Sequence, residues 1–398
     1  MAQPVHAADP IVIASAARTA MGGFQGVLSD MSGPELGAVA VRAAAERAGL
    51  SSTAVDEVLM GCVLSAGTKQ APARQAAIYG GLDENTPCTT INKMCGSGMK
   101  AVMMAHDALV AGHGDVIIAG GMESMTNAPY LLPKARGGFR LGHGEVKDHM
   151  FLDGLEDAYE GKLMGAYAEE TARSYQFSRE AQDAYAVESL TRAKRASTDG
   201  SFAPEIVPVA IKTRKGEVEI VTDEQPGKAD ASKIPTLKPA FAKDGSVTAA
   251  NSSSISDGAA ALVLMRLSEA ERRGLKPLAA IRGHAMHAQA PAWFSTAPIG
   301  AMQKLFDRVG WTKNDVDLFE INEAFAVVAM AAMKELQLNH TNVNVYGGAC
   351  ALGHPIGASG ARIIVTLLNA LKQKGGKRGV ASLCIGGGEA TALAVELL

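Results

Sequence analysis

The amino-acid sequence predicts an α/β fold built from two related units, and three observations lead to this prediction. Short apolar runs alternate along the chain with amphipathic helical stretches, which is typical of α/β proteins whose strands are mostly buried. Several short patterns recur in the same order at a nearly constant spacing, which indicates an internal duplication. The chain has 398 residues, more than one hydrophobic core usually holds, so roughly two to three packed units are expected.

The elements that support this fold class follow in chain order. Residues 11–14 form an apolar segment typical of a short buried strand, and residues 34–48 have the periodicity of an amphipathic helix. The β-branched runs at residues 116–118 and 380–383 again indicate buried strands. Residues 126–247 are richer in charged and turn-forming residues, so we interpret them as an insertion on the core.

The duplication is visible as three short patterns that occur once in each half. The counterparts of Gly49, Ser97 and Glu123 are, in order, Gly310, Ser359 and Glu389. The two members of each pair are separated by roughly 260 residues. A duplicated α/β unit explains the pattern, with the charged insertion lengthening its first copy. Chance matches among common small residues are the alternative.

Composition excludes several classes of protein. The net charge is −3, without a long run of one sign, which argues against a general nucleic-acid or membrane-surface role but permits a local basic pocket. The longest apolar run, at residues 324–333, is far shorter than the ~18 residues that span a bilayer, and the N-terminus lacks a signal-peptide pattern. Five scattered cysteines do not suit a disulfide scaffold, so we expect a reducing, cytoplasmic setting.

Cys95 is the first candidate for chemistry. It stands in the sequence Asn-Lys-Met-Cys-Gly-Ser-Gly, directly before a helical pattern. A thiol at a helix N-terminus experiences the positive end of the helix dipole, which favours the thiolate, and the neighbouring glycines allow a substrate to approach closely. The alternative is a small buried residue that only packs.

His354 and Cys384 are the candidate partners. His354 lies between glycine and Pro355, and in the internal repeat its loop takes the place that Cys95 has in the first half. Pseudo-symmetry would therefore bring the two loops together. Cys384 ends an apolar strand at the triple glycine of residues 386–388, where a thiol could transfer a proton beside free backbone N–H groups. A core cysteine next to a glycine turn is the alternative there.

Two further polar pairs have competing interpretations. Asn322 and Glu323 follow a buried strand and are either part of a site or a helix cap. His284 and His287 are three residues apart, but no third ligand has metal-site spacing, so we expect no metal site. A P-loop and a dinucleotide-binding glycine motif are also absent from the sequence.

Four motifs together resemble the thiolase family: residues 92–98, 322–325, 353–360 and 384–388. The resemblance covers essentially the whole chain. It implies a five-layered αβαβα core of two duplicated halves, with residues 1–125 completed by 248–275 as the N-terminal half and residues 276–398 as the C-terminal half. It also implies that residues 126–247 form a loop domain that binds coenzyme A, and that the chain assembles as a homotetramer, a dimer of dimers.

The implied activity is the reversible Claisen condensation of two acetyl-CoA molecules through an acyl-cysteine intermediate. By motif, Cys95 is the nucleophile, His354 accepts its proton, and Cys384 moves the Cα proton. One oxyanion hole would consist of His354 and a water held by Asn322, and the other of the backbone N–H groups of Cys95 and Gly386. Coenzyme A is substrate and product, so no cofactor is expected, and neither nucleic acid nor membrane is an expected partner.

The resemblance also implies substrate contacts. Ser253 would contact the pantetheine, and Lys228 stands where the coenzyme A nucleotide would need a cation, in place of an arginine. The channel would be lined by Met164, Phe241, Ala324 and Phe325. Phe294 stands where the family often has methionine, so the preferred acyl-chain length stays open.

Three alternatives remain. The first is a thiolase for longer 3-ketoacyl-CoA substrates of β-oxidation, with the same chemistry. The second is a condensing enzyme of the ketoacyl-synthase type, but such an enzyme would need a histidine at the position of Cys384. The third is an acyl-CoA-binding protein without turnover.

Overall fold

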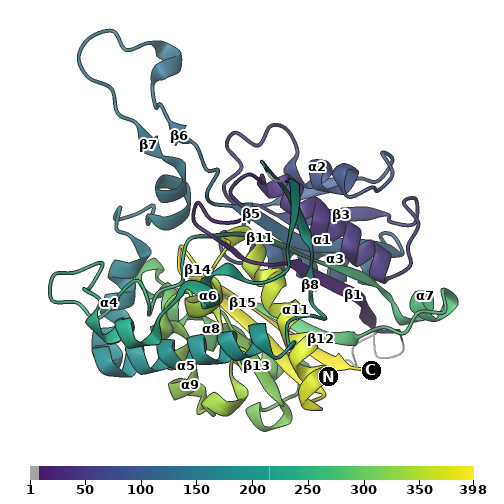
Figure 1. Cartoon of the computed structure of the whole chain (residues 1–398). Helices are drawn as coiled ribbons and strands as arrows, with labels where there is room; N and C mark the ends of the chain where they lie inside the picture. Colours follow the sequence, from purple (N-terminus) through teal and green to yellow (C-terminus); the bar gives the residue numbers. More distant parts are fainter. Residues whose placement is uncertain (1–8, 215) are drawn as a thin grey trace.

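A computed structural model describes residues 9–214 and 216–398, in which helices and sheets alternate in layers (Figure 1). Its main sheet has the strand order β13-β14-β15-β12-β1-β11-β5-β3-β4, with β2 beside β11 and β8 beside β1. Within the described residues no helix is both long and apolar enough to cross a membrane.

The two halves of this sheet have the same topology. The N-terminal half contains β1 (Ile11–Thr19), β11 (Ser256–Arg266), β5 (Val116–Ser124), β3 (Glu57–Gly61) and β4 (Cys88–Ile91). The C-terminal half contains β12 (Ala279–Ala288), β15 (Glu389–Leu397), β14 (Arg378–Ile385) and β13 (Leu318–Ile321). In each half the first two pairings are antiparallel and the third is parallel. This match confirms the predicted duplication.

The two halves are joined at a narrow junction. Strands β1 and β12 pair only through Val12 with Ala280 and Ile13 with Ala279. Away from this junction the two sheets face each other across a shared layer of helices, so the contact between the halves is made by side chains rather than by strand pairing.

Three hydrophobic clusters fill the spaces between the layers. One lies between the N-terminal sheet and the outer helices α1 (Gly33–Arg47) and α2 (Pro72–Tyr79). A second surrounds the central helices α3 (Ser97–Val110) and α11 (Ile356–Lys374), and a third lies beneath α8 (Ala297–Val309) and α9 (Ala326–Leu336). Helix α11 is buried around almost its whole circumference, which suits a helix with a sheet on each side.

The predicted elements are present with shifted ends. The strand predicted at residues 11–14 extends to Thr19, because β1 pairs with β11 from Ile11 to Arg18 and is buried along its whole length. The helix predicted at residues 34–48 begins at Gly33. Its start is fixed by a capping box, in which Ser32 and Glu35 each accept a hydrogen bond from the other's backbone N–H.

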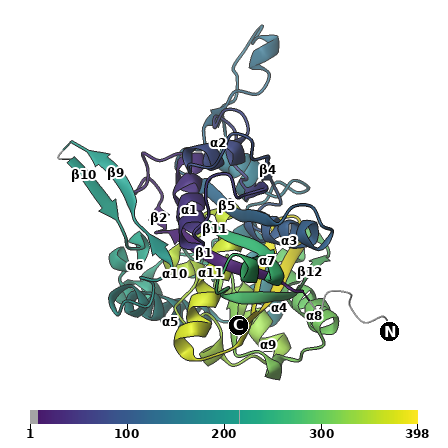
Figure 2. The same cartoon turned by 90° about the vertical axis from the view of Figure 1, so that its right-hand side faces the viewer.

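Residues 126–247 carry elements that are inserted between β5 and β11, and one of them, β8, joins the main sheet beside β1. They are β6 (Tyr130–Leu131), β7 (Lys147–Asp148), α4 (Met164–Tyr175), α5 (Arg179–Thr198), β8 (Ile206–Val207), β9 (Val209–Thr213), β10 (Gly216–Ile220) and α6 (Glu224–Lys228). The arm that carries β6 and β7 extends far from the body in Figure 1, and the β9–β10 hairpin projects in Figure 2. The remaining short elements are β2 (Gly22–Gly23), α7 (Leu267–Arg272) and α10 (Ala349–Leu352).

Candidate active site

Cys95 lies in a tight loop immediately before α3. The Ser97 hydroxyl accepts a hydrogen bond from the Lys93 backbone N–H at 2.8 Å and donates one to the Met94 carbonyl at 2.6 Å. Met94 adopts a positive φ of 46°, a conformation that non-glycine residues seldom take. The loop therefore bends sharply, and it places the half-buried Cys95 at the start of the helix.

The first turns of α3 and α11 pack against each other without room for side chains. A Cβ added to Gly98 would lie 2.8 Å from the Ala361 nitrogen, and one added to Gly360 would lie 2.4 Å from the Met99 nitrogen. Only glycine permits such a close approach. The two helix starts that correspond in the internal repeat are thus in contact, and the loop with His354 directly precedes the second of them.

Cys384 and Gly386 reach the same place from the end of β14. The Gly386 backbone N–H lies close enough to the Cys95 thiol to lower the pKa of that thiol. Cys384 is fully buried, and both its burial and the neighbouring Cys95 raise its pKa well above the usual value. The two thiols therefore share one enclosed environment.

The thiolate that the helix N-terminus favours is not the resting form of Cys95. Burial raises the pKa of Cys95 to about 11, although the Gly386 N–H and the backbone N–H of Cys95 itself lower it. The expected helix effect is therefore present but smaller than the cost of desolvating an anion. Cys95 needs a base to become nucleophilic.

His354 has one ring nitrogen that is free to accept a proton. Its Nδ1 lies 2.6 Å from the Ser359 hydroxyl, and this hydroxyl donates to the Pro355 carbonyl at 2.9 Å. Because the hydroxyl proton is used in that bond, we assign the imidazole proton to Nδ1, from which it is donated to Ser359. Nε2 is then the basic nitrogen, and it is buried with no hydrogen-bond partner among the described residues. Burial, together with the charge of Arg362, lowers the pKa of His354 to about 3, so the ring is neutral at neutral pH.

Asn322 and Glu323 do not cap α9, the helix that follows them, so the helix-cap interpretation is wrong for that helix, although Glu323 accepts a hydrogen bond from the Cys350 N–H in the first turn of α10. Helix α9 begins only at Ala326, with Phe325 at its N-cap position and no capping side chain. The Asn322 amide nitrogen lies 3.4 Å from His354 Nδ1. Glu323 is buried and accepts hydrogen bonds from the hydroxyls of Tyr185 and Ser189. Their position after the end of β13 thus directs Asn322 toward the histidine and lets Glu323 hold α5 through its hydrogen bonds.

The residues expected to line the channel form a largely apolar wall beside these groups. The Phe325 ring contacts Phe241 and Phe294 edge-to-face, with centroids 6.0 and 6.3 Å apart. Met164 begins α4, and its sulfur would lie 3.5 Å from a Cβ on Gly386. These contacts connect the wall to the end of β14.

Ser253 is tied to the same wall through the backbone of Ala324. The Ala324 carbonyl accepts hydrogen bonds from the Ser253 N–H at 2.9 Å and from its hydroxyl at 3.0 Å. Lys228 differs from the other candidates: it lies in α6, its side chain is 64% exposed, and its ammonium is paired with the buried Glu224 carboxylate. A ligand phosphate would have to compete with Glu224 for Lys228.

Sequence reasoning missed two residues that hold the site in place. One is Ser359, which fixes the His354 tautomer. The other is Glu123, whose buried carboxylate accepts hydrogen bonds from the N–H groups of Val63, Leu64 and Gly357. Both stand at positions that recur in the internal repeat, which is the signal that could have identified them.

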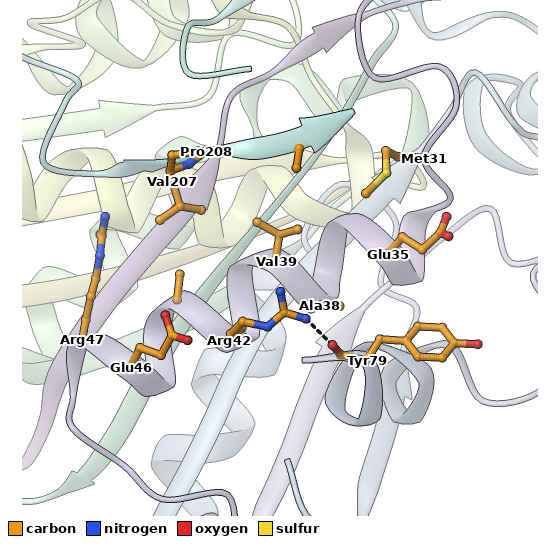
Figure 3. A pocket seen from close by; sticks show the side chains of 12 residues that line it. Met31, Glu35, Ala38, Val39, Arg42, Glu46, Arg47, Tyr79, Val207 and Pro208 are labelled. Carbon is orange, nitrogen blue, oxygen red and sulfur yellow. Dashed lines mark hydrogen bonds between the residues drawn. The ribbon is translucent and has the colours of Figure 1, made fainter. Parts of the chain in front are cut away.

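A separate hollow of about 630 Å³ lies on the outer face, between α1, the end of α2 and the start of β9 (Figure 3). Its arginines are already engaged: Arg42 donates to the Tyr79 carbonyl at 2.5 Å and Arg47 to the Ala16 carbonyl at 2.6 Å. None of the candidate site residues lines it.

Two thiols, a basic imidazole nitrogen and backbone donors at the centre of a duplicated α/β fold define an enzyme of covalent acyl transfer. The comparisons with known proteins agree with this class. The model of the thiolase N-terminal domain matches residues 11–268, and that of the thiolase C-terminal domain matches residues 275–397.

Relatives match over nearly the full length of the chain. An acetyl-CoA acetyltransferase of Cupriavidus necator is 50% identical over 97% of this chain and 99% of its own. Acetyl-CoA acetyltransferase 1 of Arabidopsis thaliana is 49% identical over 98% of this chain and 94% of its own. A thiolase of Ascaris suum, crystallised with coenzyme A, superposes with a TM-score of 0.93 at 43% identity and covers 98% of this chain and 100% of its own. The chain belongs to the thiolase family.

Proposed function

We propose that this chain is an acetyl-CoA acetyltransferase that reversibly condenses two acetyl-CoA molecules to acetoacetyl-CoA and coenzyme A. The names of the full-length relatives support this function. The observation that carries the chemistry is the contact between the starts of α3 and α11, which brings the loop of Cys95 to the loop of His354 with its unpartnered Nε2. The thiol of Cys384 lies close enough to Cys95 for the two to influence each other's charge.

In the first half-reaction, the Cys95 sulfur attacks the acetyl-CoA carbonyl carbon while its proton passes to His354 Nε2. Both groups are neutral at rest, with pKa values of about 11 and about 3, so proton transfer accompanies the attack. The C–S bond of the thioester breaks, and the departing coenzyme A thiolate takes the proton of Cys384. The products are acetyl-Cys95, a Cys384 thiolate and a protonated His354.

In the second half-reaction, the Cys384 thiolate removes a Cα proton from another acetyl-CoA. The enolate oxygen is stabilised by the protonated His354 and by a water held by Asn322. The enolate carbon attacks acetyl-Cys95, whose carbonyl oxygen faces the N–H groups of Cys95 and Gly386. The new C–C bond expels the Cys95 thiolate, which recovers its proton from His354 and restores the resting state.

Intact-protein mass spectrometry after incubation with acetyl-CoA tests this sequence of steps. The unmodified chain and a Cys88→Ala control should gain an acetyl group, whereas Cys95→Ala should gain none and lose turnover. Cys384→Ala should be acetylated slowly and then fail to condense the acetyl group with a second acetyl-CoA. Turnover by Cys95→Ala at the normal rate would refute the proposal.

The buried Phe294 and Phe325 rings at the channel support a preference for short acyl chains over the longer 3-ketoacyl-CoA alternative. Measuring kcat/KM with acetoacetyl-CoA and with 3-ketooctanoyl-CoA separates the two functions. A higher value for the longer substrate would assign the chain to β-oxidation instead.

The division of the chain, its assembly and its location complete the proposal. Residues 1–125 with 248–275, residues 126–247 and residues 276–398 are proposed as N-terminal half, coenzyme A-binding loop domain and C-terminal half; residues 1–8 lie outside the described structure. A cytoplasmic enzyme without a resident cofactor fits five free cysteines. Cell fractionation tests the location, and turnover after dialysis against a chelator tests the cofactor statement.

A homotetramer is supported by two surfaces. Among the described strands β4 pairs only with β3, which leaves its outer edge open to another chain. The arm of residues 126–149 exposes large apolar side chains, among them Tyr130 at 69%, Val146 at 60% and Leu141 at 97%, and such exposure marks an interaction surface. Light scattering of the purified chain measures the assembly directly.

A further inference from the structure

Two histidines and one aspartate from different halves of the chain meet away from the active site. His106 and Asp107 lie near the end of α3, and His284 lies on β12. One oxygen of Asp107 lies 3.0 Å from His106 Nδ1 and 2.8 Å from His284 Nε2. The ligand atoms of the three side chains all fall within 4.8 Å of one another.

This arrangement is close to the geometry of a metal site. Zinc binds imidazole and carboxylate ligands at about 2.0–2.2 Å in a tetrahedral arrangement, which separates donor atoms by roughly 3.3 Å. The carboxylate oxygen would need to withdraw by only a few tenths of an ångström to admit an ion. The two imidazoles lie edge-to-face, with ring centroids 5.0 Å apart at 88°, and each ring already directs one nitrogen to the same Asp107 oxygen.

The cluster is open to solvent on the side of Asp107. The side chains of His106 and His284 are 18% and 11% exposed, whereas Asp107 is 57% exposed. The histidines are thus supported by the protein, and the carboxylate side faces solvent. An ion could enter from there, and water could complete its coordination.

His287, the other histidine of β12, takes no part in this cluster. Residues three apart on a strand point to opposite faces, and His287 packs instead against Gly300 of α8 and contacts Gln289. The sequence offered no reason to expect a metal site at His284 and His287, and the structure instead brings His284 to two residues of α3, His106 and Asp107.

We propose that His106, Asp107 and His284 form a binding site for a divalent transition-metal ion, with Zn²⁺ as the best match to a His₂Asp ligand set. The ion clamps α3 of the N-terminal half to β12 of the C-terminal half. Its role is structural, because His106 lies about 14 Å along α3 from Ser97 at a rise of 1.5 Å per residue, whereas the candidate catalytic residues gather at the opposite end. The positive charge of Arg308, which donates to the His284 carbonyl at 2.5 Å, opposes the ion and weakens its binding.

Calorimetric titration of the full-length, tag-free and metal-stripped chain with ZnCl₂ tests the site. We expect His106→Ala, His284→Ala and Asp107→Asn each to lose one equivalent of bound zinc, or to bind it at least about tenfold more weakly. The matched control is His113→Ala, an exposed histidine just after the same helix, and it should bind like the unmodified chain. Zinc held by the catalytic thiols would persist in every variant, so the informative quantity is the difference of one equivalent.

Thermal unfolding provides a second readout. ZnCl₂ should raise the Tm of the unmodified chain and of the His113→Ala control, but it should raise the Tm of the other three variants less or not at all. Turnover of acetoacetyl-CoA should stay unchanged in all of them. If any folded variant of the three ligands retains the same zinc stoichiometry and affinity as the control, the proposal is overturned.

Discussion

The Ser359 hydroxyl lies 2.6 Å from His354 Nδ1 and is itself oriented by the Pro355 carbonyl. This pair of bonds assigns the imidazole proton to Nδ1 and leaves Nε2 as the basic nitrogen. The serine acts through the histidine and touches neither thiol, so it is a positioning residue.

Removing this hydroxyl should slow chemistry more than binding. We expect Ser359→Ala to lower kcat by roughly tenfold to a hundredfold, because a lost hydrogen bond of about 1–3 kcal/mol controls the tautomer, with little change in KM. Steady-state kinetics separate the two parameters. The control is Thr366→Val on the same helix, where the hydroxyl binds Glu205; an equal loss of kcat there would show only a packing effect.

The pH dependence of Cys95 alkylation should show a thiol with a raised pKa. With a pKa of about 11, the thiolate fraction increases about tenfold for each pH unit below that value, so iodoacetamide should inactivate the free enzyme about a hundredfold faster at pH 9 than at pH 7. Acetylation by acetyl-CoA should change far less, since His354 is neutral above its pKa of about 3 and serves as the base. A plateau of the alkylation rate below pH 8 would contradict the raised pKa.

Glu123 should be required for stability. Replacing it by Gln puts an amide NH₂ among three backbone donors, so at least one N–H loses its acceptor at a cost of about 1–3 kcal/mol. The Tm should fall by several degrees in differential scanning calorimetry. The control is Glu57→Gln, at a half-buried glutamate at the start of β3, and this substitution should change the Tm much less. A similar fall of the Tm in both variants would show that Glu123 has no special role in stability.

Phe294 should limit the length of the acyl chain. Phe294→Leu should shift the preference between acetoacetyl-CoA and 3-ketooctanoyl-CoA, expressed as the ratio of their kcat/KM values, by roughly tenfold toward the longer substrate. The reason is that space for one or two methylenes is worth about 1–3 kcal/mol. Competition between the two substrates measures the ratio directly. Phe306→Leu, on α8 and outside the wall, should leave the ratio unchanged.

Leu141, the most exposed large apolar side chain of the arm, should be needed for assembly. Leu141→Ser should convert a tetramer to a smaller species while the chain stays folded, because the side chain is 97% exposed and supports no internal packing. Light scattering measures the mass and circular dichroism the fold. A tetramer that persists with Leu141→Ser and Tyr130→Ser combined would place the interface elsewhere.

Much of the fold could be predicted from the sequence, because the duplication appears as short patterns that occur once in each half. The glycines that allow α3 and α11 to touch and the motif cysteines and histidine are all visible as short motifs. The neutral resting state of Cys95 could not be predicted in this way, because a helix N-terminus is a local feature of the sequence, whereas the desolvation of the thiol depends on how the whole chain packs. Asn322 resembled a cap for the same reason: only the structure shows that α9 begins four residues later.

The cluster of His106, Asp107 and His284 shows most clearly what could not be predicted from the sequence. His284 and Asp107 are 177 residues apart, and neither lies in a motif that relates them. Their contact depends on a β12 side chain facing the central helix layer, and this depends on the register of β12 against β15. A pattern search along the chain has no access to that register.

The place of β11 has a consequence for how the chain is made. β11 is inserted between β1 and β5 and pairs with both, yet it is separated from β5 by the whole of residues 125–255. A nascent chain leaving the ribosome therefore carries two strand edges that stay open until Ser256–Arg266 has been synthesised. Open apolar edges invite pairing with other chains. The demand for chaperones during synthesis should consequently fall not when the N-terminal motifs emerge, but when this single late strand does.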